Sequence, residues 1–248
     1  MLCHVLREDA ELAEAIPAAR RQEAIGECVA PEIYLPSSRT PSALGAHSGT
    51  GVGFLVLSGL LVRRVGIDGR FGAELLGEGD LLRPSQGEFD SPMLPLETRW
   101  LVPEPGRLAV LDDDFVQRLA RYPELAPAIV ARAMQRSRNL AVNMAIVHQA
   151  RVDVRLHMLL WHLAGRWGRV RSDGTVVPLR LTHALLADLV AARRPTVTSA
   201  LTDLARRGLV RSQGDSWVLF GEAPVELLDI DGTAAPRRRE APSLASRT

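Results

Sequence analysis

Residues 181–210 read LTHALLADLVAARRPTVTSALTDLARRGLV, and this stretch predicts two short amphipathic helices joined by a tight turn. In both halves, apolar residues recur at steps of one, three and four, which is the spacing of a buried helical stripe. Thr182 suits the N-cap of the first helix, Pro195 suits the first turn of the second, and Gly208 suits a left-handed residue that ends it. The stripe residues are Leu185, Leu186, Leu189 and Val190 in the first half and Val197, Ala200, Leu201 and Leu204 in the second.

With these stripes packed together, the second helix has an outer face rich in Arg, Thr and Ser. An Arg at the entrance of a helix can donate two hydrogen bonds to guanine, whereas Thr and Ser hydroxyls suit phosphates and the Thr methyl suits the thymine methyl. Such a helix pair can place one helix in the DNA major groove while the other rests on the phosphates. We therefore predict contacts to double-stranded DNA from Thr182, His183, Arg193, Arg194, Pro195, Thr196, Thr198, Ser199, Thr202, Arg206 and Arg211.

The flanking segments predict a winged-helix module around this pair. Leu209–Ser212 and Ser216–Phe220 are β-prone runs on either side of a Gln-Gly-Asp turn, which favours a hairpin. A second hairpin is predicted over residues 169–181, where Pro178 would confine its strand to a sheet edge. An apolar helix is expected over 153–167, upstream of both.

Together, the helix pair, the wing and the long helix upstream resemble the Crp/Fnr family of bacterial transcription regulators. The resemblance is closest over about residues 102–220, weaker over 50–83, weakest over 1–49 and absent beyond the wing. It implies a C-terminal winged helix that reads DNA and an N-terminal β-roll of the cyclic-nucleotide-binding type that senses a signal. It also implies RNA polymerase as a further partner.

The resemblance can be applied residue by residue to the second helix of the pair. Arg194 falls where the family has its first base-reading Arg. Pro195 falls where the best-known members have a Glu that reads a cytosine, and Ser199 falls where they have a second reading Arg. Because only the first position is retained, the operator of those members is not expected here.

The charge distribution agrees with this placement. Residues 1–152 hold 16 Arg and 19 acidic residues, a net charge of −3, whereas residues 153–220 hold 10 Arg and 5 Asp, a net charge of +5. The remaining residues have 4 Arg and 5 acidic residues, a net charge of −1. A positive segment that coincides with the helix pair is what binding to phosphates requires.

Other classes of protein find little support in the sequence. There is no run of 18 apolar residues and no basic head before an apolar segment, so we expect neither a membrane span nor a secretory signal, and we expect a cytoplasmic protein. Cys3 and Cys28 are too few for a disulfide framework or an iron–sulfur cluster. No His set has metal-ligand spacing and no catalytic motif occurs, so we expect neither a cofactor nor an enzyme.

The N-terminal half predicts a β-roll. After a helical segment over residues 1–27, in which Leu12, Ala15 and Ile16 are candidate packing positions, short β-prone runs alternate with Gly, Pro and Ser. The runs are Val29–Leu35, Gly53–Leu57, Leu60–Ile67, Ala73–Leu76, Trp100–Val102 and Leu108–Leu111, with turns at 58–59, 68–69 and 77–80.

An effector pocket in this roll would differ from that of the family. The turn over 77–80 resembles the one that precedes the family's phosphate cassette, but Leu81-Leu82-Arg83-Pro84 follows it in place of a Gly-Glu pair, and no Arg-Ser pair occurs between 85 and 100. Proline has no carboxylate and no N–H donor, so the ribose clamp is missing. We therefore do not expect cyclic AMP to bind. Glu74 and Arg83 are the candidate pocket residues, the effector is unknown, and the Pro- and Ser-rich stretch 84–98 is either a lid or a linker.

A long helix is predicted between the two halves, from Leu125 to about His148. Its seam residues recur at steps of four and three, which favours a parallel coiled-coil homodimer, although the same stripe could pack on its own β-roll. The seam residues are Ala126, Val130, Ala133, Ser137, Leu140, Met144 and Val147.

The sequence thus predicts an α+β protein with four parts: a sensor domain over 1–124, a dimerisation helix over 125–150, a winged helix-turn-helix over 151–222 and a mostly disordered tail over 223–248. The tail is rich in Pro, Ser, Ala and Arg. A sequence-specific, homodimeric DNA-binding regulator that reads an inverted repeat is the first hypothesis. The alternative is a ligand-sensing or protein-interaction module whose winged helix docks on a protein.

Overall fold

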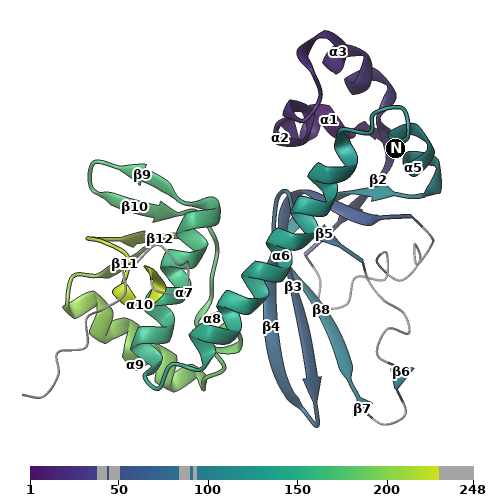
Figure 1. The fold of residues 1–248 in the computed structure, drawn as a ribbon. Coiled ribbons are helices and arrows are strands. Elements are labelled where there is room, and N and C mark those ends of the chain that lie inside the picture. The colour runs from purple at the N-terminus through teal and green to yellow at the C-terminus, as the bar shows by residue number, and fades with distance from the viewer. Residues whose placement is uncertain (38–43, 45–50, 84–89, 92–93, 229–248) are drawn as a thin grey trace, which may run out of the picture.

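The computed structural model describes residues 1–37, 44, 51–83, 90–91 and 94–228. The chain forms an N-terminal lobe and a C-terminal lobe, and the long helix α6 (Leu125–Val147) runs from the first to the second (Figure 1). The predicted order of roll, long helix and winged helix is confirmed.

The N-terminal lobe is built on an antiparallel sheet with strand order β1-β2-β8-β3-β4, and β5 pairs with β3 outside this path. Among the described residues, the helices α1, α2, α3 and α5 and the short strand pair β6–β7 lie around it (Figure 1). The strands are β1 (Leu2–His4), β2 (Val29–Leu35), β3 (Gly53–Ile67), β4 (Arg70–Leu76), β5 (Leu81–Leu82), β6 (Asp90–Ser91), β7 (Leu94–Pro95) and β8 (Glu97–Leu111). The helices are α1 (Val5–Glu8), α2 (Ala10–Glu14), α3 (Ala18–Glu27) and α5 (Asp113–Leu119).

Strand β3 is continuous where the sequence predicts two strands and a turn at Ser58-Gly59. The register against β8 shifts at this point, so the segment is a bulge and the prediction of a turn is wrong. Gly59 has φ +88°, and a Cβ there would lie 2.4 Å from the Gly106 Cα of the neighbouring strand. Glycine therefore permits a close backbone approach here, which sequence reading alone does not distinguish from a turn.

Two other predicted turns are confirmed. Asp68 and Gly69 join β3 to β4 with φ values of +52° and +73°, as a type I′ hairpin turn requires. In the turn over 77–80, Gly79 has φ +82° and the Gly77 N–H donates to the Asp80 carboxylate at 2.8 Å.

The first 27 residues differ from the predicted helical segment because they begin with a strand, β1, which pairs with β2. Leu12 and Ile16 are buried as predicted and Ala15 is partly buried. They contribute to a core between the sheet, the N-terminal helices and the start of α6, which holds the N-terminal lobe and that helix together.

The C-terminal lobe contains a four-stranded sheet in the order β11-β12-β10-β9. Strand β10 is interior, so the prediction of an edge strand is wrong: β10 ends at Val177, and the restriction imposed by Pro178 never applies. The wing hairpin is confirmed. The strands are β9 (Arg169–Arg171), β10 (Gly174–Val177), β11 (Val210–Gln213) and β12 (Ser216–Leu219), and the helices are α7 (Val152–Trp167), α8 (His183–Leu189), α9 (Arg194–Arg206) and α10 (Val225–Leu228).

One apolar core is shared by the two lobes. Leu60, Val62 and Leu75 of the roll belong to the same buried cluster as the stripe residues of α7, α8 and α9. The winged helix is therefore packed directly on the roll as well as tethered by α6. The tail beyond residue 228 and most of the 84–98 stretch lie outside the described residues. No helix in the described part of the chain is long and apolar enough to cross a membrane.

Candidate nucleic-acid interface

Helices α8 and α9 form the predicted helix pair, with the predicted stripe residues buried between them. The Thr182 hydroxyl accepts a hydrogen bond from the Leu185 N–H at 3.2 Å, so the N-cap is confirmed. Pro195 lies in the first turn of α9, and Gly208 has φ +68° directly after it. These local features fix the length and direction of both helices.

The outer face of α9 is exposed. The guanidinium groups of Arg193, at the N-cap, and Arg194, in the first turn, have no hydrogen-bond or ion-pair partner among the described residues. No side chain caps the free amides of this helix end. An unpaired guanidinium at a helix N-terminus is available to an anionic or acceptor-rich ligand. The other predicted contact residues on α9 are exposed too: Pro195, Thr196, Thr198, Ser199, Thr202 and Arg206.

His183 lies partly buried at the start of α8. Its Nδ1 is 3.0 Å from Thr198 Oγ1, and its ring is 6.4 Å from that of Trp217 on β12. The predicted contact residues Thr182, His183 and Thr198 are thus brought together by α8, α9 and the wing.

Several cations of this lobe are already engaged. Arg206 pairs with Asp203 at 3.0 Å, and Arg207 pairs with Asp153 at 3.3 Å. Arg211 on β11 lies over the Phe220 ring at 4.9 Å, which holds it on the wing. A hydrogen bond from Arg151 is the main reason why the pKa of Asp153 is below its ordinary value.

Sequence reasoning missed Arg155 on α7. Its Nε donates to Gln149 O at 2.6 Å and its Nη1 donates to Val190 O at 3.1 Å. One guanidinium therefore joins the end of the long helix to the turn between α8 and α9. On the sequence it looks like any exposed Arg of an amphipathic helix, and only the tertiary contact distinguishes it.

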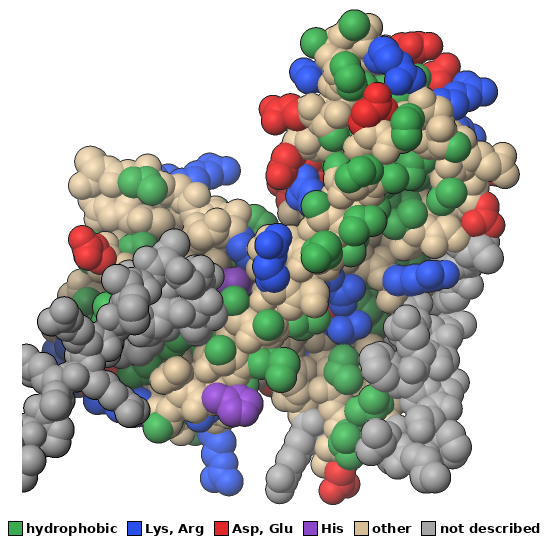
Figure 2. Space-filling model, in the orientation of Figure 1, with side chains coloured by type: hydrophobic (Ala, Val, Ile, Leu, Met, Phe, Trp, Pro, Cys, Tyr) green, Lys and Arg blue, Asp and Glu red, His purple; other side chains and the backbone are tan. Residues whose placement is uncertain are grey.

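The predicted seam lies along α6, with an apolar surface open to solvent. Val130 and Met144 are 56% and 63% exposed, Ala126, Ala133 and Ser137 are exposed, and Leu140 and Val147 are partly buried. Met134, which the seam prediction omits, is also exposed. Hydrophobic side chains follow the helix between the two lobes in Figure 2. Uncovered apolar residues of this size on one helix face are typical of an interaction surface.

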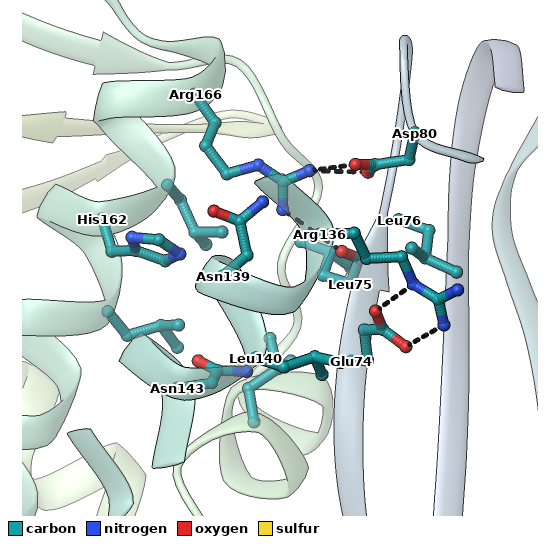
Figure 3. Close-up of a pocket in the computed structure, with 13 residues that line it drawn as sticks. Glu74, Leu75, Leu76, Asp80, Arg136, Asn139, Leu140, Asn143, His162 and Arg166 are labelled. Atoms are coloured by element: carbon teal, nitrogen blue, oxygen red, sulfur yellow. Dashed lines mark hydrogen bonds and ion pairs between the residues drawn. The ribbon is translucent and has the colours of Figure 1, made fainter. Parts of the chain in front are cut away.

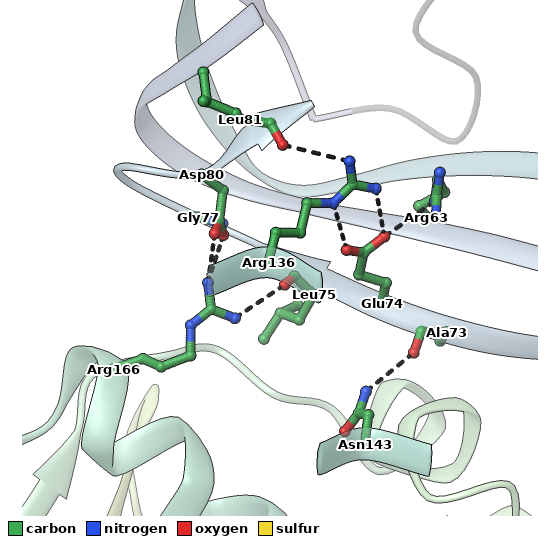
Figure 4. A network of polar contacts seen from close by, with 10 residues as sticks. All are labelled: Arg63, Ala73, Glu74, Leu75, Gly77, Asp80, Leu81, Arg136, Asn143 and Arg166. Carbon is green, nitrogen blue, oxygen red and sulfur yellow. Dashed lines mark hydrogen bonds and ion pairs between the residues drawn. The ribbon is translucent and has the colours of Figure 1, made fainter. Parts of the chain in front are cut away.

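Ion pairs connect the roll to α6 and α7, as Figure 4 shows. Asp80 receives two hydrogen bonds from Arg166 of α7, at 2.7 and 2.6 Å, and Arg166 also donates to Leu75 O. Glu74 receives two from Arg136 of α6, at 2.7 and 2.9 Å, and pairs with Arg63 at 3.0 Å. Burial raises the pKa of Asp80 above its ordinary value, whereas the charge of Arg166 opposes this shift.

Of the two candidate pocket residues, Glu74 is only 7% exposed and faces α6 in this network, whereas Arg83 is exposed just after β5. Glu74, Arg136, Asn143 and Arg166 line a cavity of about 20 Å³ between the lobes (Figure 3). A cavity of that volume holds about one water molecule, so it is too small for an effector.

The described residues contain no group of three or more His, Cys, Asp or Glu side chains that could hold a metal ion. Both cysteines are buried free thiols, and burial raises the pKa of Cys28 to about 11. A thiol with a raised pKa has little nucleophilic thiolate.

Comparison with known proteins identifies the C-terminal lobe. Residues 154–220 match the model of the Crp-like helix-turn-helix domain. Over 111 residues the chain is 32% identical to the CRP-like cAMP-activated global transcriptional regulator of Mycobacterium tuberculosis, an alignment that covers 44% of this chain and 50% of that protein. The chain thus spans about half the length of the curated relative that it matches.

The whole fold is also found in solved structures. A cyclic nucleotide-binding domain containing protein from Listeria monocytogenes is similar with a TM-score of 0.60 and 13% identity, over 85% of this chain and 96% of that one. FixK2 from Bradyrhizobium japonicum is similar with a TM-score of 0.56 and 15% identity, over 84% and 98%. At these identities the likeness shows a shared fold, which confirms the predicted architecture.

Proposed function

Starting from a chain whose residues 154–220 form a Crp-like helix-turn-helix domain, we propose that it is a homodimeric, sequence-specific DNA-binding transcription regulator. The observation that carries this proposal is the first turn of α9: Arg194 is exposed and unpaired among the described residues, while the opposite face of the helix is buried. An Arg in that position can donate to guanine O6 and N7 in the major groove. Such a regulator would act in the cytoplasm.

The test is binding of the purified protein to operators selected from random duplexes. Arg194→Ala should weaken binding to the selected site by about 1–3 kcal/mol and relax the choice of one base per half-site. Arg169→Ala is the matched control, since it removes the same charge from β9, which lies at the other end of the lobe from α9 (Figure 1). Equal binding to all duplexes, or a protein captured in place of DNA, would contradict the proposal.

The homodimer is proposed from the exposed apolar face of α6. Two copies joined along this seam would present two α9 helices about 34 Å apart, one turn of DNA, so the operator would be an inverted repeat. The seam continues between the two lobes, where a partner helix could cover Val130 and Met144 at once.

The effector domain is proposed to be divergent and not to bind cyclic AMP. Arg83-Pro84 follows Leu81-Leu82 at the place where the family's cassette has its Gly-Glu pair, and Glu74 is already paired with Arg136 and Arg63. Calorimetric titration with cyclic AMP should give no heat of binding, while a control titration with the selected operator should.

The ion pairs between the lobes could transmit a structural change from the N-terminal roll to the winged helix. Arg166 joins the 77–80 turn to α7, and Arg64 of β3 pairs with Asp188 of α8. A change in the roll that alters these contacts would change the angle of the winged helix, as a two-state switch requires.

A further inference from the structure

Three of the four exposed hydroxyl groups on α9, those of Thr198, Ser199 and Thr202, donate their proton to the helix backbone. Thr198 Oγ1 donates to Arg194 O at 3.1 Å, Ser199 Oγ donates to Pro195 O at 3.2 Å, and Thr202 Oγ1 donates to Thr198 O at 3.0 Å. A hydroxyl has one proton and two lone pairs. Each of these side chains therefore presents hydrogen-bond acceptors to a ligand and no donor.

The hydroxyl of Thr198 is held in this state from a second side. Because its own proton goes to Arg194 O, the 3.0 Å contact with His183 requires His183 Nδ1 to be the donor. The His183 ring is in turn placed against the buried Trp217. Contacts to α8 and β12 thus fix the orientation of a side chain on α9, and one lone pair of Thr198 Oγ1 stays free.

We propose, on the premise of the proposed function, that α9 selects a half-site in which a guanine is followed by A·T pairs. Arg194 has only donors and matches the two acceptors of guanine. An A·T pair offers the adenine N6 amino donor together with the thymine methyl group. The acceptor oxygen and methyl group of Thr198 and Thr202 complement both, whereas Ser199 offers the acceptor alone.

The spacing of these residues along α9 predicts where the A·T pairs lie relative to the guanine. Thr198 follows Arg194 by four residues, or about 6 Å of helix rise. Successive base pairs are about 3.4 Å apart, so the Thr198 contact lies roughly two base pairs from the guanine. Thr202 lies one further turn along the same face.

This inference changes the role that the sequence suggests for the hydroxyls. Donation to a phosphate would require each hydroxyl to give up its bond to the backbone carbonyl, which leaves that carbonyl without this partner. Phosphate contacts are left to groups whose donors are free, such as Arg193 and the uncapped amides of α9.

The experiment uses the full-length protein and the operator selected from random duplexes. At each predicted A·T pair, the adenine is replaced by 2′-deoxypurine nucleoside, which lacks the N6 amino group, or the thymine by deoxyuridine, which lacks the methyl group. Each change should weaken wild-type binding by about three- to tenfold, the effect of losing one ordinary contact.

Val and Ser substitutions distinguish the hydrogen bond to the adenine amino group from the contact with the thymine methyl group. Thr198→Val keeps a methyl group but has no acceptor, so it should lose sensitivity to the purine substitution and keep sensitivity to deoxyuridine. Thr198→Ser should show the reverse, and Thr202→Val and Thr202→Ser should repeat the pattern at the next pair. An unchanged dependence of binding on salt would show that each variant folds and keeps its phosphate contacts.

Two outcomes would overturn the inference and are distinguishable. A selected half-site with G·C at these positions, or Val variants that stay sensitive to the purine substitution, would refute the reading of A·T pairs while leaving a DNA-binding regulator intact. Failure to select any sequence, with intact folding, would refute the proposed function and this inference with it.

Discussion

The Arg166 guanidinium, in the last turn of α7, donates hydrogen bonds from Nη2 to both carboxylate oxygens of Asp80 in the 77–80 turn of the roll. The Arg166 guanidinium also lies 3.9 Å from the centroid of the neighbouring Trp167 ring. The two residues are 86 positions apart in sequence. A turn that resembles the one preceding the family's phosphate cassette thus contacts the C-terminal lobe here through an ion pair.

Breaking this pair should destabilise the protein in a pH-dependent way. Arg166→Met leaves the Asp80 carboxylate buried and unpaired, which should cost about 3–5 kcal/mol at neutral pH. Desolvation already raises the pKa of Asp80, and without Arg166 it should rise further. A carboxyl with a raised folded-state pKa contributes stability that is present at acid pH and lost as pH rises through that pKa. The defect, measured by urea unfolding, should therefore shrink as pH falls from that raised pKa towards 3.8, the ordinary value of an aspartate, and should be smallest below it.

The control for this measurement is Arg166→Met combined with Asp80→Asn. With both charges gone, most of the lost stability should return and its pH dependence should vanish. A double variant as unstable as the single one would show that Arg166 acts through its packing on Trp167.

Gly77 should be required for the same contact. A Cβ at this position would lie 2.7 Å from Cζ2 of Trp167, so Gly77→Ala must displace the indole. We expect a loss of about 1–3 kcal/mol in unfolding free energy together with altered tryptophan fluorescence. Gly72→Ala is the control, since its Cβ would have only Val65 O within 4 Å, at 3.9 Å, and should be tolerated.

The seam on α6 should determine the oligomeric state. Val130→Glu places a charge on the exposed apolar face, so the proposed dimer should dissociate and the mass measured by light scattering should fall by half. Gln135→Glu adds the same charge on another face of α6 and should leave the mass unchanged. A dimer that tolerates Val130→Glu would place the interface elsewhere.

The cap of α8 should contribute to the stability of the protein. Thr182→Ala removes the acceptor for the Leu185 N–H and should lower the unfolding free energy by about 1 kcal/mol. Thr182→Ser keeps the oxygen and should retain the wild-type stability. Chemical unfolding of the three proteins side by side measures the effect, and equal stability of the Ala variant would refute the assigned cap.

Features that depend on local chemistry could be predicted from the order of the residues alone. Caps, turns and stripe spacing are properties of neighbouring residues, so Thr182, Gly208 and the hydrophobic stripes of α8 and α9 could be predicted directly. The same holds for the Asp68-Gly69 hairpin turn, because an Asp-Gly pair favours the two successive positive φ angles that are found there.

Features that depend on residues far apart in the chain could be recognised only in the folded structure. Gly59 reads as a turn in sequence but allows the approach of Gly106, and Arg155 reads as a surface charge but joins two helix ends. The outward chemistry of Thr198 likewise depends on His183, fifteen residues away. A hydrogen bond or a close approach between residues far apart in the chain produces no periodic pattern in the sequence. The geometry of the outer face of α9 could therefore be obtained only from the folded structure.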